Sequence, residues 1–320
     1  MTLIRPIGHS GLETPPLVLG SNVFGWTIDQ ETSFRVLDAF VAGGGRMIDT
    51  ADVYSAWAPG NRGGESEAII GQWLKRRGRR DDVLIATKVG MLEIDGAKGL
   101  APAHIVKAID ASLRRFGTDY VDLYYAHRDD EGEDQAAVAD AFDALVKSGK
   151  VRAVAASNFT RDRLASALKA QAGKARYVAL QNQYNLLERD AFEGDLQRFC
   201  VENDVPLLPY YGLASGYLSG KYRTEADLRG KARGSAAAKY MAGHGPRVLA
   251  AMDEVAEESG AQHAQIALAW LAAQPGVVAP IASATSVAQV ESLLGSMTLA
   301  LSESQLTRLS EASALAEASV

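Results

Sequence analysis

The sequence predicts an α/β fold, a (β/α)8 TIM barrel formed by one domain over residues 1–320. Short β-branched runs alternate with longer segments of helical periodicity, and this unit recurs eight times. Parallel strands joined by helices in a chain of this length close into a barrel more readily than they form an open sheet. The alternative, a doubly wound sheet, is disfavoured because no G-x-G-x-x-G follows the first strand.

The expected strands, in chain order, are Leu17–Leu19, Arg46–Ile48, Val83–Thr87, Val121–Tyr125, Val151–Ala156, Tyr177–Leu180, Val205–Leu208 and Val277–Pro280. The expected helices are Glu31–Ala42, Ser66–Arg77, Pro102–Phe116, Gln135–Ser148, Arg161–Ala170, Phe192–Asn203, Arg247–Gln274 and a last one near Ala288–Leu294. Pro102 suits a first helical turn, where its missing N–H costs nothing. Thr160 can cap the helix that follows it, and the glycines after Ala42 can end the first helix.

Two segments lie outside the repeat. Residues Leu3–Thr14, with Gly8 and Gly11 as turn residues, predict an N-terminal β-hairpin over the barrel floor. Residues Gly212–Gly245 form an extended loop after the seventh strand, rich in glycine, alanine and charge. A loop of this length at the active face of a barrel is typical of a lid.

Composition restricts the function classes. The chain is 47% apolar and 22% charged with a net charge of −6, which is ordinary for a globular protein and disfavours nucleic-acid binding. Cys200 is the only cysteine, so no internal disulfide forms, and neither a signal peptide nor a membrane-spanning run is evident. We therefore expect a cytoplasmic protein without a membrane partner. No H-x-H or H-E-x-x-H pattern occurs, so we expect no metal site.

Four side chains that can carry chemistry follow the second, third and fourth strands. Asp49, Lys88 and His127 stand at the three strand ends, one strand–helix unit apart, and Tyr54 lies in the loop after Asp49. Active sites of such barrels form at the C-terminal ends of the strands. Because consecutive strands are neighbours in a barrel, we expect these four groups to converge.

The segments around these residues resemble the catalytic tetrad of aldo-keto reductases: Asp49-Thr-Ala-Asp-Val-Tyr54, Thr87-Lys88 and Tyr125-Ala-His127. The resemblance runs from the first strand to about Leu301. It implies an enzyme that moves a hydride between a nicotinamide cofactor and a carbonyl of a small molecule. Two alternatives on the same fold stay open: an NAD-dependent sugar or alcohol dehydrogenase, and a slow cofactor-binding subunit resembling potassium-channel β subunits.

Carbonyl reduction needs a proton on oxygen as well as a hydride on carbon. A free tyrosine, with a pKa near ~10, is a weak acid at neutral pH. An adjacent ammonium favours the phenolate, so we expect Lys88 to lower the pKa of Tyr54, with Asp49 keeping Lys88 charged and oriented. His127 would hydrogen-bond the carbonyl oxygen.

The resemblance also implies a cofactor site. Ser157 and Asn158 after strand five, and Gln181 after strand six, match residues that hold the nicotinamide carboxamide, and Tyr210 matches the aromatic that stacks on the ring. The run from Leu213 to Lys221 resembles the family's pyrophosphate segment. Leu213, Ser215 and Gly216 are its expected cofactor contacts, with Ser215 and Gly216 closest to the phosphates.

After strand eight, Ser283, Thr285 and Gln289 can bond a phosphate or a ribose hydroxyl at a helix N-terminus. The basic residue that the family often uses for the 2′-phosphate is replaced here by Thr285 or Ser286. We favour NADP on family grounds, with NAD as the alternative.

Apolar side chains in the loops after the early strands are expected to line the substrate opening: Phe24, Trp26, Trp57 and Met91. The end of the chain lacks a long aromatic loop, so we expect an open, permissive site.

Overall fold

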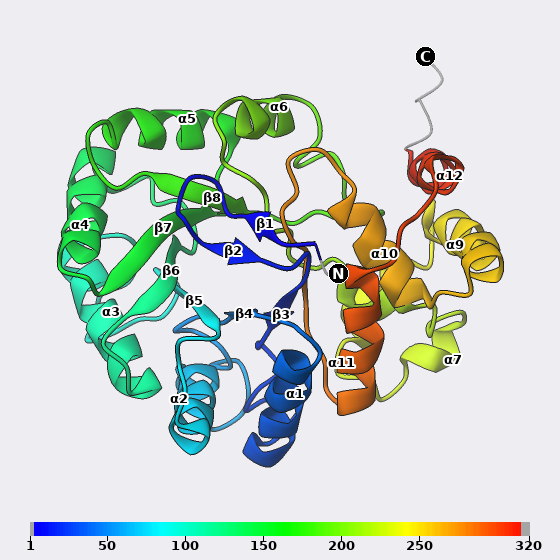
Figure 1. The fold of residues 1–320 in the computed structure, drawn as a ribbon, viewed down its shortest axis with the longest axis horizontal. Coiled ribbons are helices and arrows are strands. Elements are labelled where there is room, and N and C mark those ends of the chain that lie inside the picture. Colours follow the sequence, from blue (N-terminus) through cyan, green and yellow to red (C-terminus); the bar gives the residue numbers. More distant parts are fainter. Residues whose placement is uncertain (1–2, 315–320) are drawn as a thin grey trace.

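The computed structural model describes residues 3–314 and shows a curled parallel sheet surrounded by helices (Figure 1). Seven strands run in the order β8-β7-β6-β5-β4-β3-β9, every neighbouring pair parallel. An additional antiparallel hairpin, β1–β2, stands apart from this sheet. The strands are β1 (Arg5–Pro6), β2 (Glu13–Thr14), β3 (Val18–Gly20), β4 (Met47–Asp49), β5 (Leu84–Val89), β6 (Val121–Ala126), β7 (Val151–Ser157), β8 (Tyr177–Gln181) and β9 (Ile281–Ala282).

The outer ring consists of helices that follow the strands in sequence. Their bounds are α1 (Gln30–Ala42), α2 (Glu65–Arg77), α3 (Pro102–Phe116), α4 (Gln135–Lys147), α5 (Arg161–Ala170), α6 (Asp195–Glu202), α9 (Gly245–Ser259), α10 (His263–Ala272), α11 (Val287–Leu294) and α12 (Glu303–Ser313). Two short helices, α7 (Glu225–Leu228) and α8 (Gly234–Ala238), and the 3-10 turns η1 (Ala214–Ser219) and η2 (Gly295–Met297) complete the set.

The barrel closes through single bridges where two full strands were expected. Leu207 bridges Leu180 of β8 on one side and Val277 on the other, and Ile281 N donates to Pro209 O at 2.9 Å. The predicted strand Val205–Leu208 is therefore an extended segment with isolated bridges, and the eighth strand lies at Ile281–Ala282 rather than Val277–Pro280. Pro206, Pro209 and Pro280 lack the N–H that a continuous ladder needs, which explains the interruption.

Alternate residues of the strands fill the barrel interior, since successive side chains of a strand point to opposite faces. One buried cluster contains Met47 of β4, Leu84 and Ala86 of β5, and Leu123 and Tyr125 of β6. Ala153 and Ala155 of β7 and Val178 and Ala179 of β8 belong to the same cluster. The larger cluster lies between the strands and the helices.

The predicted hairpin is present and covers the floor of the barrel (Figure 1). Its buried Ile7 and Leu12 belong to the interior cluster. The guanidinium of Arg5 donates to the backbone oxygens of Ala272, Val277 and Val278 at 2.7, 3.3 and 3.3 Å. The hairpin thus ties the start of the chain to the segment that closes the barrel.

Several helix boundaries agree with the sequence signals. Thr160 Oγ1 accepts from Arg163 N at 3.3 Å, and Pro102 occupies the first turn of α3. After α1, the left-handed residue is Gly44. The predicted single helix Arg247–Gln274 is wrong, because Gly260 adopts φ 71° and ends α9 before α10 begins at His263. Helix α12 was not predicted.

Candidate active site

The inward-facing side chains of β4, β5 and β6 are followed, at the C-terminal end of the barrel, by three of the predicted catalytic residues. Two residues beyond Met47 stands Asp49, two beyond Ala86 stands Lys88, and two beyond Tyr125 stands His127. The register confirms their proximity, because Asp49 pairs with Ala86 and Lys88 with Tyr125. The period of two therefore directs three polar side chains into one end of the barrel.

Lys88 is the centre of the polar cluster and is 1% exposed. Its Nζ donates to Asp49 Oδ1 at 2.6 Å, to Thr50 O at 2.7 Å and to Tyr54 Oη at 3.0 Å. These contacts use the three N–H groups of an ammonium. The expected convergence of Asp49, Tyr54 and Lys88 is thus present in the geometry.

Burial and charge act against each other on Tyr54. Desolvation raises the pKa of Tyr54, Lys88 lowers it, and the net direction is upward. Lys88 thus lowers the pKa of Tyr54 as expected, but burial, which the sequence analysis did not weigh, has the larger effect. Burial also lowers the pKa of Lys88, but Asp49 and Tyr54 outweigh it and raise that pKa, so the amine stays cationic.

His127 lies beside this pair as a neutral group. Its ring stands 6.1 Å from the Tyr54 ring, measured between centroids, with an angle of 70° between the planes. Burial, followed by the charges of Lys88 and Arg128, lowers the pKa of His127 well below its usual range. Its Nδ1 is buried with no hydrogen-bond partner among the described residues. A neutral imidazole can donate one hydrogen bond to a substrate oxygen.

Residues expected around the nicotinamide ring form a bonded frame beside the cluster. Gln181 Nε2 donates to Asp49 Oδ2 at 2.8 Å, and Ser157 Oγ donates to Gln181 O at 2.8 Å. Asn158 Nδ2 donates to His127 O at 2.9 Å, and Tyr210 Oη donates to Asn158 Oδ1 at 2.7 Å. These contacts link the C-terminal ends of β4, β6, β7 and β8 with Tyr210 at the seventh barrel position.

The segment after Tyr210 has an unusual backbone. Ala214, Ser215 and Gly216 are consecutive residues with φ of 46°, 58° and 91°, in the region that L-residues rarely adopt. Such local strain clusters at ligand sites. Leu213 precedes this turn, and a Cβ added to Gly216 would lie 3.2 Å from Lys221 Nζ. The amine of Lys221 therefore lies close against the backbone of the turn.

The residues expected after strand eight surround the start of α11. Ser283 Oγ donates to Asn22 Oδ1 at 2.6 Å. Thr285 donates to Gln289 Oε1 from its N at 2.8 Å and from its Oγ1 at 3.1 Å. Gln289 thereby braces the loop that leads into the helix.

Two cations missed by the sequence reasoning lie near these segments. Arg233, from the long loop, donates to the same Asn22 oxygen at 3.3 Å and stands 5.9 Å from the Trp26 ring. Burial lowers the pKa of Arg233 and of Lys221, and Arg233 and Lys231 lower that of Lys221 further. No ion pair within residues 3–314 includes Lys221 or Arg233. Because Arg233 approaches Ser283 only through the folded loop, sequence order gave no signal for it.

An aromatic group borders Tyr54. Trp57, 48% exposed, lies 5.8 Å from the Tyr54 ring and 5.7 Å from the Trp26 ring. Met91 is also exposed. Phe24 was expected at the opening, but it is 0% exposed and packs in the core, so it does not line the opening. Tyr211, 47% exposed and 5.2 Å from Tyr210, is a rim aromatic that the sequence analysis missed.

Comparison with known proteins agrees with this geometry. The sequence profile of the aldo/keto reductase family matches residues 16–314, which is nearly the whole chain. The chain belongs to the aldo/keto reductase family. The (β/α)8 barrel, with the tetrad positions at its C-terminal end, is therefore the fold of an oxidoreductase family.

This aldo/keto reductase is similar to several curated proteins over most of their lengths. It is 32% identical to the uncharacterized oxidoreductase YrpG of Bacillus subtilis, covering 95% of this chain and 94% of that protein. It is 31% identical to Protein tas of Escherichia coli, covering 95% of both. A fungal aryl-alcohol dehydrogenase [NADP(+)] from Phanerodontia chrysosporium is 28% identical over 94% of this chain and 83% of its own length.

The described residues form neither a metal-binding cluster nor a membrane-spanning helix. Residues 3–314 contain no group of three or more histidine, cysteine, aspartate or glutamate side chains arranged to hold a metal ion. Within the same range, every helix is too short or too polar to span a bilayer.

Proposed function

We propose that this aldo/keto reductase reduces aldehydes and ketones to alcohols with NAD(P)H, and that Tyr54 is the proton donor. The observation that carries the proposal is the 3.0 Å contact between Lys88 Nζ and Tyr54 Oη, with Asp49 holding the amine at 2.6 Å. A buried, fixed cation beside a phenol stabilises negative charge on that phenol, because the surrounding dielectric is low.

A bound nicotinamide would supply the hydride for the carbonyl carbon. Tyr54 delivers its proton to the carbonyl oxygen, and the phenolate left on Tyr54 is stabilised by Lys88. Asp49 keeps Lys88 oriented, and Gln181 fixes the second oxygen of Asp49. His127, neutral because of its lowered pKa, donates a hydrogen bond to the same substrate oxygen. A positioned acid of this kind contributes roughly 10²–10⁴ in rate.

The residues around the long loop fit a cofactor with phosphate groups. In the strained turn at Ala214–Gly216, Ala214 N and Gly216 N already donate to Tyr211 O and Leu213 O at 2.7 and 2.8 Å, so among the described contacts the N–H of Ser215 is the one available to an anion. Lys221 and Arg233 are partly desolvated cations without carboxylate partners in the described chain, a state that a bound anion would relieve. We propose NADP as the preferred cofactor, with Arg233, near Ser283, at the 2′-phosphate.

The aromatic rim favours planar, apolar carbonyl substrates. Trp26, Trp57 and Tyr54 form edge-to-face pairs, a geometry that leaves ring faces available for stacking. One relative, matched over 83% of its length, is named an aryl-alcohol dehydrogenase, which is consistent with this choice. We further propose that the chain acts as one domain. We also propose that it works in the cytoplasm, because Cys200 has no partner for a disulfide.

A matched pair of assays tests the proposal. Wild-type protein is incubated with NADPH or NADH and a panel of aromatic and aliphatic aldehydes, and both cofactor oxidation and alcohol formation are followed. We expect equal molar amounts of oxidised cofactor and alcohol, with a lower KM for NADPH than for NADH. Absence of alcohol with every aldehyde, in protein that binds the cofactor, would contradict the proposed activity.

A further inference from the structure

A cationic cleft opens at the end of the barrel opposite Tyr54, between the C-terminal turns of α2 and α3. Its volume is about 410 Å³, within the range of small-molecule sites. The cleft adjoins the segments that lead into β5 and β6, whereas the proposed active site lies at the far ends of the same strands. It is therefore separate from the cofactor groove.

Glycines shape the cleft. At Gly71 the two helices touch, because an added Cβ would lie 2.1 Å from Arg115 O. Beyond this contact, α2 ends at Gly78 and α3 at Gly117, both left-handed caps whose added Cβ would meet nothing within 4 Å. The chains thus diverge from a closely packed base, and the open space between them forms the cleft.

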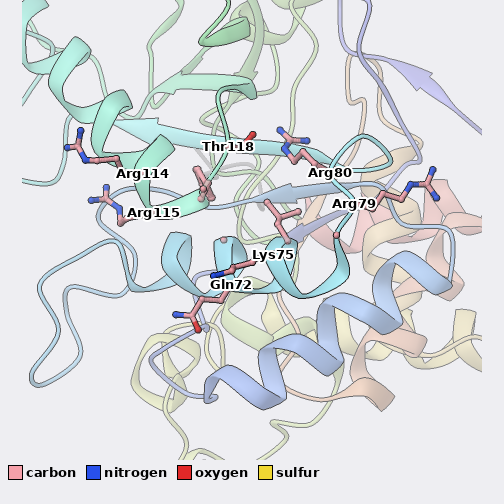
Figure 2. A pocket seen from close by; sticks show the side chains of 12 residues that line it. Gln72, Lys75, Arg79, Arg80, Arg114, Arg115 and Thr118 are labelled. Carbon is pink, nitrogen blue, oxygen red and sulfur yellow. The ribbon is translucent and has the colours of Figure 1, made fainter.

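Five of the twelve lining residues are cations, in a chain whose net charge is −6. None of the described residues that line the cleft is acidic. Figure 2 shows Arg114 and Arg115 on one side, Arg79 and Arg80 on the other, and Lys75 and Thr118 between them. The cationic side chains therefore come from two separate helix ends that face a shared space.

These cations differ in how far the fold already uses them. Arg115 Nε bonds Glu67 at 2.6 Å, Arg80 Nη2 bonds Asp122 at 2.6 Å and Arg79 Nε bonds Asp81 at 3.1 Å, so these three arginines already have acidic partners. Lys75 and Arg114 are exposed, and neither forms an ion pair within residues 3–314. Basic residues are favoured at helix C-termini because they interact with the helix dipole. That preference does not explain why the described lining of the cleft between the two helix ends lacks acidic residues. Unneutralised positive charge on a concave surface attracts anions.

We propose that this cleft binds a small anion with two phosphate groups, that is, a diphosphate. Guanidinium and ammonium groups on opposite sides can each hold one phosphate, and arginine matches the geometry of phosphate oxygens. Phe116, the only aromatic among the described residues that line the cleft, is 1% exposed and offers no face for stacking a base. Recognition therefore rests on the phosphate groups.

The test is calorimetric titration of inorganic pyrophosphate into the full chain at low salt. The cleft variant is Lys75→Gln/Arg114→Gln, which removes two exposed cations and leaves the pairs with Glu67 and Asp122 intact. Two controls carry the same charge change: Lys221→Gln/Arg233→Gln in the cofactor groove, and Lys98→Gln/Lys169→Gln on other exposed surface. Unfolding midpoints and aldehyde reduction by the cleft and surface variants should match the wild type.

We expect a saturable pyrophosphate site that weakens by about tenfold or more in the cleft variant and by less than about twofold in both controls, whereas any pyrophosphate binding in the cofactor groove is lost in Lys221→Gln/Arg233→Gln instead. Pyrophosphate should also slow amide exchange in residues 71–80 and 114–118. Unchanged affinity in the cleft variant, or no saturable binding by the wild type, would overturn the proposal. Citrate or single phosphate binding as tightly as pyrophosphate would overturn the preference for a diphosphate.

Discussion

At the scale of single residues, the proposed chemistry depends on where the barrel interior changes from apolar to polar. The same inward columns that hold Met47, Ala86 and Tyr125 end in Asp49, Lys88 and His127. A lysine at 1% exposure would be strongly destabilising without a partner, and here Asp49 compensates it. Because Lys88 is buried, it needs Asp49 as a partner. The same burial strengthens the electrostatic effect of Lys88 on Tyr54.

The coupling between Lys88 and Tyr54 gives a prediction about pH. Lys88 lowers the pKa of Tyr54 against the larger upward effect of burial. In Lys88→Met that pKa should rise further, so alcohol oxidation, which needs the phenolate as a base, should begin at a higher pH. The measurement is the pH–rate profile of oxidation with NADP for wild type, Lys88→Met and Lys88→Arg. Because Lys88→Arg keeps a cation, its profile should lie between the other two.

Superimposable profiles of wild type and Lys88→Met would contradict this coupling. Cofactor binding, followed by protein fluorescence, serves as the check that Lys88→Met remains folded. Asp49 keeps its bond from Gln181 in this variant, so its carboxylate retains one donor.

The tetrad positions could be predicted from the sequence because each lies a fixed distance from a strand end. The net pKa of Tyr54 could not, since it depends on how much burial opposes the nearby charge. Phe24 was misplaced for a related reason: an aromatic residue in a loop after a strand can equally face the core, and here it is 0% exposed. Side-chain direction in loops lacks the alternation that fixes it in strands.

At the scale of elements, the long loop after Tyr210 brings together parts that are distant in the chain. Asn22, from the loop after β3, accepts from Arg233 in this loop and from Ser283 near β9. The loop thus spans the region where we propose the cofactor phosphates. Its cations were not assigned from the sequence because tertiary folding alone brings Arg233 to Asn22.

Arg233→Gln tests the proposed contact with the 2′-phosphate. The glutamine can still donate to Asn22, but it has no charge, and charge-assisted bonds to phosphate contribute about 1.5–3 kcal/mol. We expect the Kd for NADPH to rise by about tenfold or more, with a smaller change for NADH. Fluorescence titration measures both constants, and Lys169→Gln is the control for charge. A Kd for NADPH within about twofold of the wild type would place the 2′-phosphate elsewhere.

Secondary structure was predictable where one local signal dominated. Pro102 and Thr160 mark the starts of α3 and α5 as expected. The helical periodicity from Arg247 to Gln274 hid a break, because Gly260 ends α9 while apolar spacing continues into α10. Prolines interrupt the two last barrel positions, so their pairing is reduced to bridges and a two-residue strand.

At the scale of the whole molecule, the two ends of the barrel have different tasks. The floor is closed by the hairpin, whose Ile7 and Leu12 complete the apolar interior. The opposite end carries the polar cluster of Lys88. Stability and chemistry therefore depend on different residues, as is general for this fold.

Leu12→Ala tests this division of tasks. Leu12 is 2% exposed, and truncating a buried leucine typically costs about 2–5 kcal/mol. We expect a lower urea midpoint of unfolding with kcat and KM close to wild type at a temperature where both proteins are folded. Leu3→Ala, at a leucine that is 58% exposed, is the matched control and should leave the midpoint unchanged. A loss of kcat in Leu12→Ala under those conditions would show that the floor also shapes the site.

The central claim is that the hydroxyl of Tyr54 supplies the proton, and Tyr54→Phe tests it most directly. The substitution keeps the ring that packs near Trp57 and His127 and removes only the oxygen bonded to Lys88. With NADPH bound as in the wild type, single-turnover reduction of an aromatic aldehyde should slow by about 10²-fold or more. Reduction by Tyr54→Phe at more than about a tenth of the wild-type rate would contradict the account.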